Sequence, residues 1–161
     1  CAHATCWSIL RHYSERYSVH REYLTHDITM MAQQFDPGGL VPSKGLEISN
    51  AERVFQAAGT YPYVVTKIDA NRPDPSFYRQ LIAYVESGFP LFAAMHRREH
   101  AMAVVGCEWK ASGAAVPGGL RYAWEELTAL IAVDDNHLPY LPVAYSSVGL
   151  ALPIRPRTST R

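Results

Sequence analysis

The chain lacks the features that mark several classes of protein. Its 15 basic residues equal its 15 acidic residues, so no excess of positive charge indicates a nucleic-acid or anionic-membrane partner. No apolar run approaches the length that a membrane-spanning helix needs. Three cysteines in 161 residues do not describe a disulfide scaffold, and their odd number leaves at least one thiol free. These absences favour a protein of a reducing compartment, with no membrane span and no nucleic-acid partner.

The N-terminal residues also lack the basic and apolar regions of a signal peptide. We therefore expect a cytoplasmic protein. Because the chain begins at Cys1 without Met, we also expect a fragment or a processed product whose targeting segment can have been lost upstream. An apolar content of 48% and a charged content of 19% are those of an ordinary folded protein, and the length fits one domain better than two.

Helical periodicity dominates the first half of the chain and strand-like patterns dominate the second. The apolar spacing predicts helices at residues 7–17, at about 27–35 with Asp27 as N-cap, at 47–58, and at 75–86. Strands are predicted at residues 61–68, 90–95, 100–109, 130–134 and about 142–152, with turns or loops at 36–39 and 110–119. This order predicts one α+β domain over residues 1–161: a mainly helical half (1–88), a mainly β half (89–153) and a tail (154–161).

Cys6 is the first candidate for chemistry, because the pattern places it with Trp7 at the start of the first helix. The unpaired N–H groups and positive dipole of a helix N-terminus favour a thiolate. This dipole contributes ~0.3–1 kcal/mol, whereas lowering a pKa by one unit takes about 1.4 kcal/mol. A strongly nucleophilic Cys6 therefore needs a second partner, most naturally a protonated histidine.

Two later segments offer that partner and a group to orient it. His100 opens the predicted strand 100–109, in which Ala101 and Ala103 leave room behind it. The apolar strand 130–134 ends in Asp134 and Asp135. A carboxylate can fix the tautomer of a histidine and stabilise its charged form. Because side chains alternate along a strand, only one of the two acids can face His100, and we favour Asp134 over Asp135.

Together these motifs resemble papain-like cysteine peptidases. Cys6-Trp7, with Cys1 upstream, is similar to the Cys-Trp that opens the family's active-site helix. The sequence His-Ala-Met-Ala-Val-Val-Gly at residues 100–106 is similar to the family's His-Ala strand that ends in Val-Gly-Tyr, with Cys107 in the Tyr place. Residues 87–91 resemble the family's Gly-x-Pro strand start, and residues 133–135 resemble the Asp segment of bacterial bacteriocin-leader-processing peptidases.

The resemblance implies a papain-like fold in which Cys6 attacks a carbonyl, His100 carries the proton and Asp134 orients His100. It implies a peptide or protein substrate, and neither a cofactor nor a metal. The family's oxyanion-binding Gln would fall one place before Cys1, so His3 or a backbone N–H, including that of Cys6, is expected to replace it. Hydrolysis of a peptide or isopeptide bond is the leading activity, with acyl transfer and deamidation as alternatives.

Plainer interpretations also stand. The chain can be a papain-like binding module without catalysis, and Cys1, His3 and Cys6 can together hold a structural zinc ion. Cys107 is expected in the core. The remaining histidines have no partner pattern and are interpreted as surface residues: His12, His20, His26 and His137, with His96 in a turn.

Overall fold

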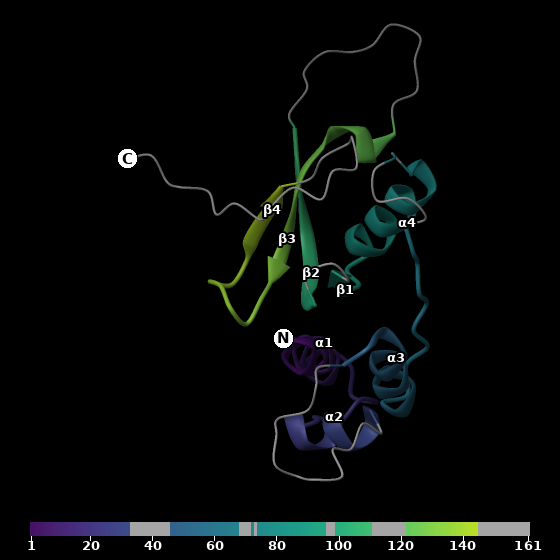
Figure 1. Ribbon diagram of the computed structural model, residues 1–161, viewed down its shortest axis with the longest axis vertical. Coiled ribbons are helices and arrows are strands. Elements are labelled where there is room, and N and C mark those ends of the chain that lie inside the picture. The colour runs from purple at the N-terminus through teal and green to yellow at the C-terminus, as the bar shows by residue number, and fades with distance from the viewer. Residues whose placement is uncertain (33–45, 68–71, 73, 96–98, 111–121, 145–161) are drawn as a thin grey trace, which may run out of the picture. The chain divides into compact units, whose positions relative to one another are not determined.

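The computed structural model describes residues 1–32, 46–67, 72, 74–95, 99–110 and 122–144. These residues form four α-helices, one 3-10 helix and four strands (Figure 1). The helices are α1 (Ala2–Arg16), α2 (Thr25–Ala32), α3 (Ile48–Ala57), α4 (Pro75–Glu86) and η2 (Ala123–Glu126); the strands are β1 (Leu91–Met95), β2 (His100–Trp109), β3 (Leu127–Val133) and β4 (Leu141–Ala144). The strands form one sheet in the order β1-β2-β3-β4. The predicted α+β class is confirmed.

A capping side chain and two glycines mark ends of helices α3 and α4. Asp74 caps α4 by accepting a hydrogen bond from the Phe77 N–H at 3.1 Å. Gly59 and Gly88 follow α3 and α4 with φ of +82° and +81°, a conformation that glycine adopts without steric cost. The predicted helices at 47–58 and 75–86 are therefore confirmed to within a residue or two.

Helices α1 and α2 differ from the predicted ones at their N-termini. Helix α1 begins at Ala2 rather than at residue 7, so Cys6 lies in its second turn and not at its start. Ala2 and Ala4 are strong helix formers and extend the helix toward the N-terminus. The prediction rested on the spacing of larger apolar residues, which begins only after Cys6. Asp27 lies inside the first turn of α2, where its carboxylate accepts the Leu24 N–H at 2.8 Å; it satisfies that helix end without being the N-cap.

The strand predicted at residues 61–68 is wrong for the part that the structure describes. Residues 61–67 belong to no strand. Their β-branched and aromatic side chains point largely to solvent, with Tyr61 97% exposed and Tyr63 67% exposed. High strand propensity reflects packing on a half-buried sheet, and this segment has no such surface to pack on.

The strands of the second half match the predictions more closely. Strand β2 has the predicted bounds, and β3 starts three residues earlier than predicted. Strands β3 and β4 pair antiparallel, with Ala129 opposite Ala144 and Ala132 opposite Leu141. Several predictions lie outside the described residues: Phe35, the turn 36–39, the loop at 111–119, the last strand beyond residue 144, and the tail.

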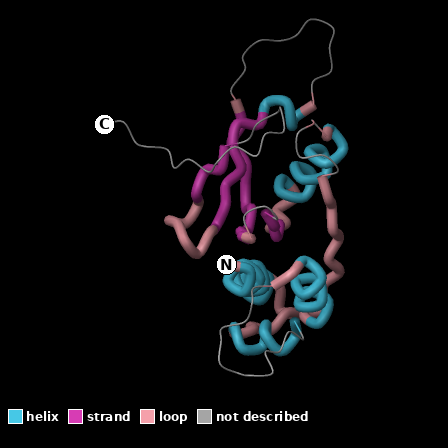
Figure 2. The backbone as a smooth tube through the Cα atoms, viewed as in Figure 1, coloured by secondary structure: helices cyan, strands magenta, loops and turns pink. Residues whose placement is uncertain are grey.

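The chain divides into two compact units. The first comprises Cys1–Val64, Phe92–Ala103 and Asp134–Leu138; the second comprises Val65–Leu91, Val104–Val133 and the chain from Pro139 onward. In the first unit α1, α2 and α3 pack against one another (Figure 1), and their core holds Cys6, Ile9, Leu10, Ile28 and Val54. In the second, η2 packs against α4 (Figure 2), where Tyr78 stacks on Trp124. No helix in the described part of the chain combines the length and apolarity needed to cross a membrane.

Candidate active site

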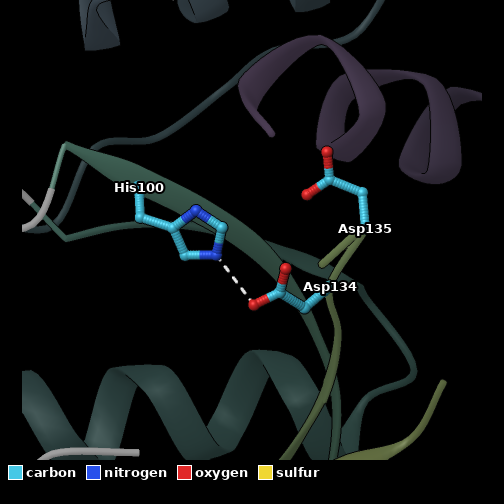
Figure 3. Close-up of side chains that lie close together, drawn as sticks. All are labelled: His100, Asp134 and Asp135. Carbon is cyan, nitrogen blue, oxygen red and sulfur yellow. Dashed lines mark hydrogen bonds and ion pairs between the residues drawn. The ribbon is translucent and has the colours of Figure 1, made fainter. Parts of the chain in front are cut away.

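His100 and Asp134 meet in the first compact unit, although 34 positions separate them in sequence. His100 is the first residue of β2, and Asp134 directly follows β3, the neighbour of β2 in the sheet. The His100 Nε2 atom lies 2.7 Å from the Asp134 Oδ2 atom (Figure 3). The Asp134 side chain is fully buried and that of His100 is 16% exposed. The structure thus brings together two of the three residues predicted to form the site.

Asp134 is held as a carboxylate by donors on both of its oxygens. Its Oδ1 atom accepts the Asn136 backbone N–H at 2.9 Å, and its Oδ2 atom is also 3.2 Å from the Nδ1 atom of His137. Burial raises the pKa of Asp134, but the hydrogen bonds from Asn136, His100 and His137 and the charge of His100 outweigh burial and lower that pKa below its ordinary value. A carboxylate at Asp134 can orient a histidine ring.

The Nδ1 atom of His100 makes no hydrogen bond to another described residue. Because a carboxylate only accepts hydrogen bonds, the Nε2 atom of His100 carries the proton in this contact, and a neutral ring then presents a lone pair on Nδ1. The preceding residue, Glu99, has a φ of +49°, in the left-handed region that non-glycine residues rarely adopt. Such strain persists where surrounding structure fixes a side chain, here at the start of the strand that carries His100.

Asp135 pairs with α1 rather than with His100, although its carboxylate lies within 4.8 Å of a ring nitrogen of His100. Its Oδ2 atom pairs with the N-terminal amine of Cys1 at 3.1 Å, and Figure 3 shows its carboxylate turned toward α1 while that of Asp134 faces His100. Of the two acids that the sequence offered, Asp134 is the one that contacts the histidine. The Asp135 contact also places the first turn of α1 beside the turn that carries Asp134. Cys6 lies about 7.5 Å further along the axis of α1, at 1.5 Å per residue.

The Cys6 thiol lies in a very different environment. Its side chain is fully buried among apolar residues, and it makes no hydrogen bond to any residue that the structure describes. Burial raises the pKa of Cys6 to about 12. Forming the thiolate at pH 7 then costs about 7 kcal/mol, far more than a helix dipole supplies. The thiol is therefore protonated in this state, and the structure does not join it to His100.

The expected oxyanion donors also differ from the prediction. The Thr5 N–H donates to the Cys1 carbonyl at 2.8 Å, so the ladder of hydrogen bonds within α1 has begun before Cys6. The Cys6 N–H lies inside this ladder and is not available to bind an oxyanion, contrary to the prediction. His3 is part of the same helix. Its pKa is lowered mainly by burial and to a smaller extent by the positive charge of the terminal amine.

The histidine and the two acids are also the described residues best placed to hold a metal ion. Among the described residues, His100, Asp134 and Asp135 form the one group of three such side chains whose ligand atoms lie within 4.8 Å of one another. Cys1, His3 and Cys6 do not form such a group, so the predicted zinc alternative gains no support.

Cys107 is half-buried rather than fully buried, and burial and Glu86 raise its pKa to about 11.

The sequence interpretation missed His137, which it treated as a surface residue. The signal that points to it is the short segment 134–137, in which Asp is followed two places later by Asn. Asp side chains often bond to the backbone two residues on, and this Asx turn returns the following side chain toward the acid.

Comparison of the chain with protein-family models, curated proteins and solved structures gave no match.

Proposed function

We propose that this chain is a thiol hydrolase that acts on a peptide or isopeptide bond through Cys6, His100 and Asp134. The single observation that carries the proposal is the 2.7 Å contact between His100 Nε2 and Asp134 Oδ2, which leaves the Nδ1 atom of His100 for a second partner. A buried carboxylate that orients an imidazole is the arrangement that general-base catalysis on a thiol needs. The papain-like assignment remains part of this proposal.

The position of Cys6 supports the same interpretation. Three segments that are distant in sequence contribute Cys6, His100 and Asp134 to one compact unit, and the start of α1 contacts the residue next to Asp134. In the proposed reaction the Cys6 thiol gives its proton to the Nδ1 atom of His100 and attacks the carbonyl carbon. The amine then leaves with that proton, and water hydrolyses the thioester to release the acid and restore the thiol. Because Cys6 is buried in this state, substrate binding has to uncover it.

The experiment is labelling with a peptide that carries a thiol-directed electrophile, followed by mass spectrometry of each cysteine. We expect labelling at Cys6 and at least a hundredfold slower labelling in His100→Ala, because a positioned base typically contributes 10²–10⁴-fold. His26→Ala is the matched control, since His26 is exposed on α2. Equal rates in the parent and His100→Ala would refute the Cys–His pair. Mass spectrometry of the products of a cleaved substrate then separates hydrolysis from acyl transfer and deamidation.

A second candidate function is a papain-like binding module without catalysis. The observation that favours it is the buried Cys6 thiol, with a pKa raised to about 12 and no hydrogen bond to a described residue. In this case Cys6→Ala would bind the same peptides as the parent with the same affinity, and neither protein would release a product. Turnover that is lost in Cys6→Ala would exclude this candidate.

A further inference from the structure

His137 shares one oxygen of Asp134 with His100. The two ring nitrogens, His100 Nε2 and His137 Nδ1, lie 2.7 Å and 3.2 Å from the same Oδ2 atom. The His137 side chain is 42% exposed, whereas that of Asp134 is fully buried. The His137 ring is therefore turned toward the buried Asp134 carboxylate and does not point wholly into solvent.

The chain holds His137 in this place through a compact turn. The His137 N–H donates to the Asp134 carbonyl at 3.2 Å, and the Asn136 N–H donates to Asp134 Oδ1 at 2.9 Å. Two backbone donors thus fix the residues between the acid and the second histidine. The conformation of this turn places the His137 ring beside the Asp134 carboxylate, so the contact follows from the backbone of the segment.

Sharing one oxygen has a definite chemical consequence. An ionised carboxylate donates no hydrogen bond, so both ring nitrogens that contact Oδ2 must carry a proton. The second donor restricts rotation of the carboxylate, because turning Oδ2 away from His100 would also break the contact with His137. A carboxylate that is fixed in this way favours the form of His100 with its proton on Nε2 and its lone pair on Nδ1.

We propose that His137 is a positioning residue of the site: its Nδ1–H fixes the Asp134 carboxylate so that His100 presents Nδ1 to the thiol. The inference rests on the proposed function of Cys6, His100 and Asp134, and assigns His137 no contact with substrate. Positioning partners of this kind typically change activity by 10–100-fold when they fix the ligands of a metal. Because His137 acts here through a carboxylate and another ring, we expect an effect of about tenfold, at the lower end of that range.

Two variants test the proposal. His137→Leu keeps a side chain of similar bulk without a donor, and His137→Asn keeps an N–H near the place of Nδ1. The first measurement is the ¹⁵N NMR spectrum of the His100 ring, which reports which nitrogen carries the proton. We expect the Nε2–H form to dominate in the parent, a mixture of both forms in His137→Leu, and the parental spectrum in His137→Asn. His26→Leu is the matched control and should leave the His100 ring unchanged.

The second measurement is the labelling of Cys6 by the peptide electrophile. We expect His137→Leu to lower the maximal labelling rate about tenfold without changing the concentration for half-maximal rate, and His137→Asn to restore the rate. Identical His100 spectra in the parent and His137→Leu would overturn the proposal, whether or not Cys6 is labelled. A changed His100 spectrum with no labelling of Cys6 in any protein would support the positioning of His100 and refute the proposed hydrolase.

Discussion

The imidazole side and the thiol side of the candidate site are built in opposite ways. On the imidazole side, His100 and His137 converge on Asp134, whose two oxygens accept three hydrogen bonds. On the thiol side, the side chain of Cys6 is buried, and its thiol forms no hydrogen bond with a described residue. The first side fixes a histidine ring against a carboxylate, while the second keeps its thiol neutral and covered. Under the proposed function, Cys6 has to be uncovered before it can react.

The largest expected effect concerns the thiol side alone. At pH 8 about a quarter of an ordinary cysteine is ionised, whereas a thiol with the pKa of about 12 found for Cys6 is ionised to about 1 part in 10⁴. We expect iodoacetamide to alkylate Cys6 about 10³-fold more slowly in the native chain than in the chain unfolded in urea. Mass spectrometry resolves the rate at each cysteine.

The other two cysteines are internal controls in the same sample. Cys1 is exposed and should react almost as fast in the native chain as in urea; Cys107, with its pKa raised to about 11, should be intermediate. Native alkylation of Cys6 at the unfolded rate would remove the contrast between the two sides. If that fast rate were lost in His100→Ala, the thiol would be paired with the imidazolium even without substrate.

The next prediction removes the centre of the imidazole side. Asp134→Asn keeps the shape of the side chain but lacks the charge that accepts from two histidine rings. We expect the variant to lose roughly 1–3 kcal/mol of unfolding free energy at pH 7, because buried donors lose a charged acceptor. Thermal or urea unfolding measures this loss. Asp135→Asn is the matched control: its side chain is 35% exposed, and its loss should stay within about 1 kcal/mol.

The same pair of proteins tests the lowered pKa of Asp134. A carboxyl group whose pKa is lower in the folded state stabilises the fold fully above its ordinary pKa of about 4. This stabilisation is lost as the pH falls from that value through the folded pKa. Between pH 5 and pH 3 the melting temperature of the parent should therefore fall more steeply than that of Asp134→Asn. Parallel curves would show that Asp134 gains no stability from its partners.

The sequence predicted the imidazole side better than the thiol side, for a physical reason. His100 and Asp134 occupy the ends of adjacent strands, and strand ends can be located from alternation and turn residues. The depth at which Cys6 is buried depends on the packing of α1 against other helices, which no local pattern encodes. The first turn of α1 was missed for a related reason, because Ala2 and Ala4 carry helix propensity but no apolar periodicity. His137 was missed because its partner lies in a turn rather than on a periodic face.

The smallest expected effect compares backbone strain on the two sides. Glu99 precedes His100 with a φ of +49°, which costs a non-glycine residue roughly 1–2 kcal/mol. Glycine removes this strain but adds about 0.5–1 kcal/mol of backbone entropy to be lost on folding. Glu99→Gly should therefore change the unfolding free energy by between 0 and about 1.5 kcal/mol in the stabilising direction.

Ala4→Gly is the matched variant on the thiol side. Ala4 lies in α1 two residues before Cys6, where the backbone is helical and a glycine relieves no strain, so the change should destabilise by about 1 kcal/mol. Urea unfolding of both variants gives two shifts of opposite sign if the imidazole side alone carries backbone strain. Destabilisation by Glu99→Gly would mean that the conformation before His100 costs less than the glycine entropy. His100 would then be held by its hydrogen bond to Asp134 and not by a strained strand start.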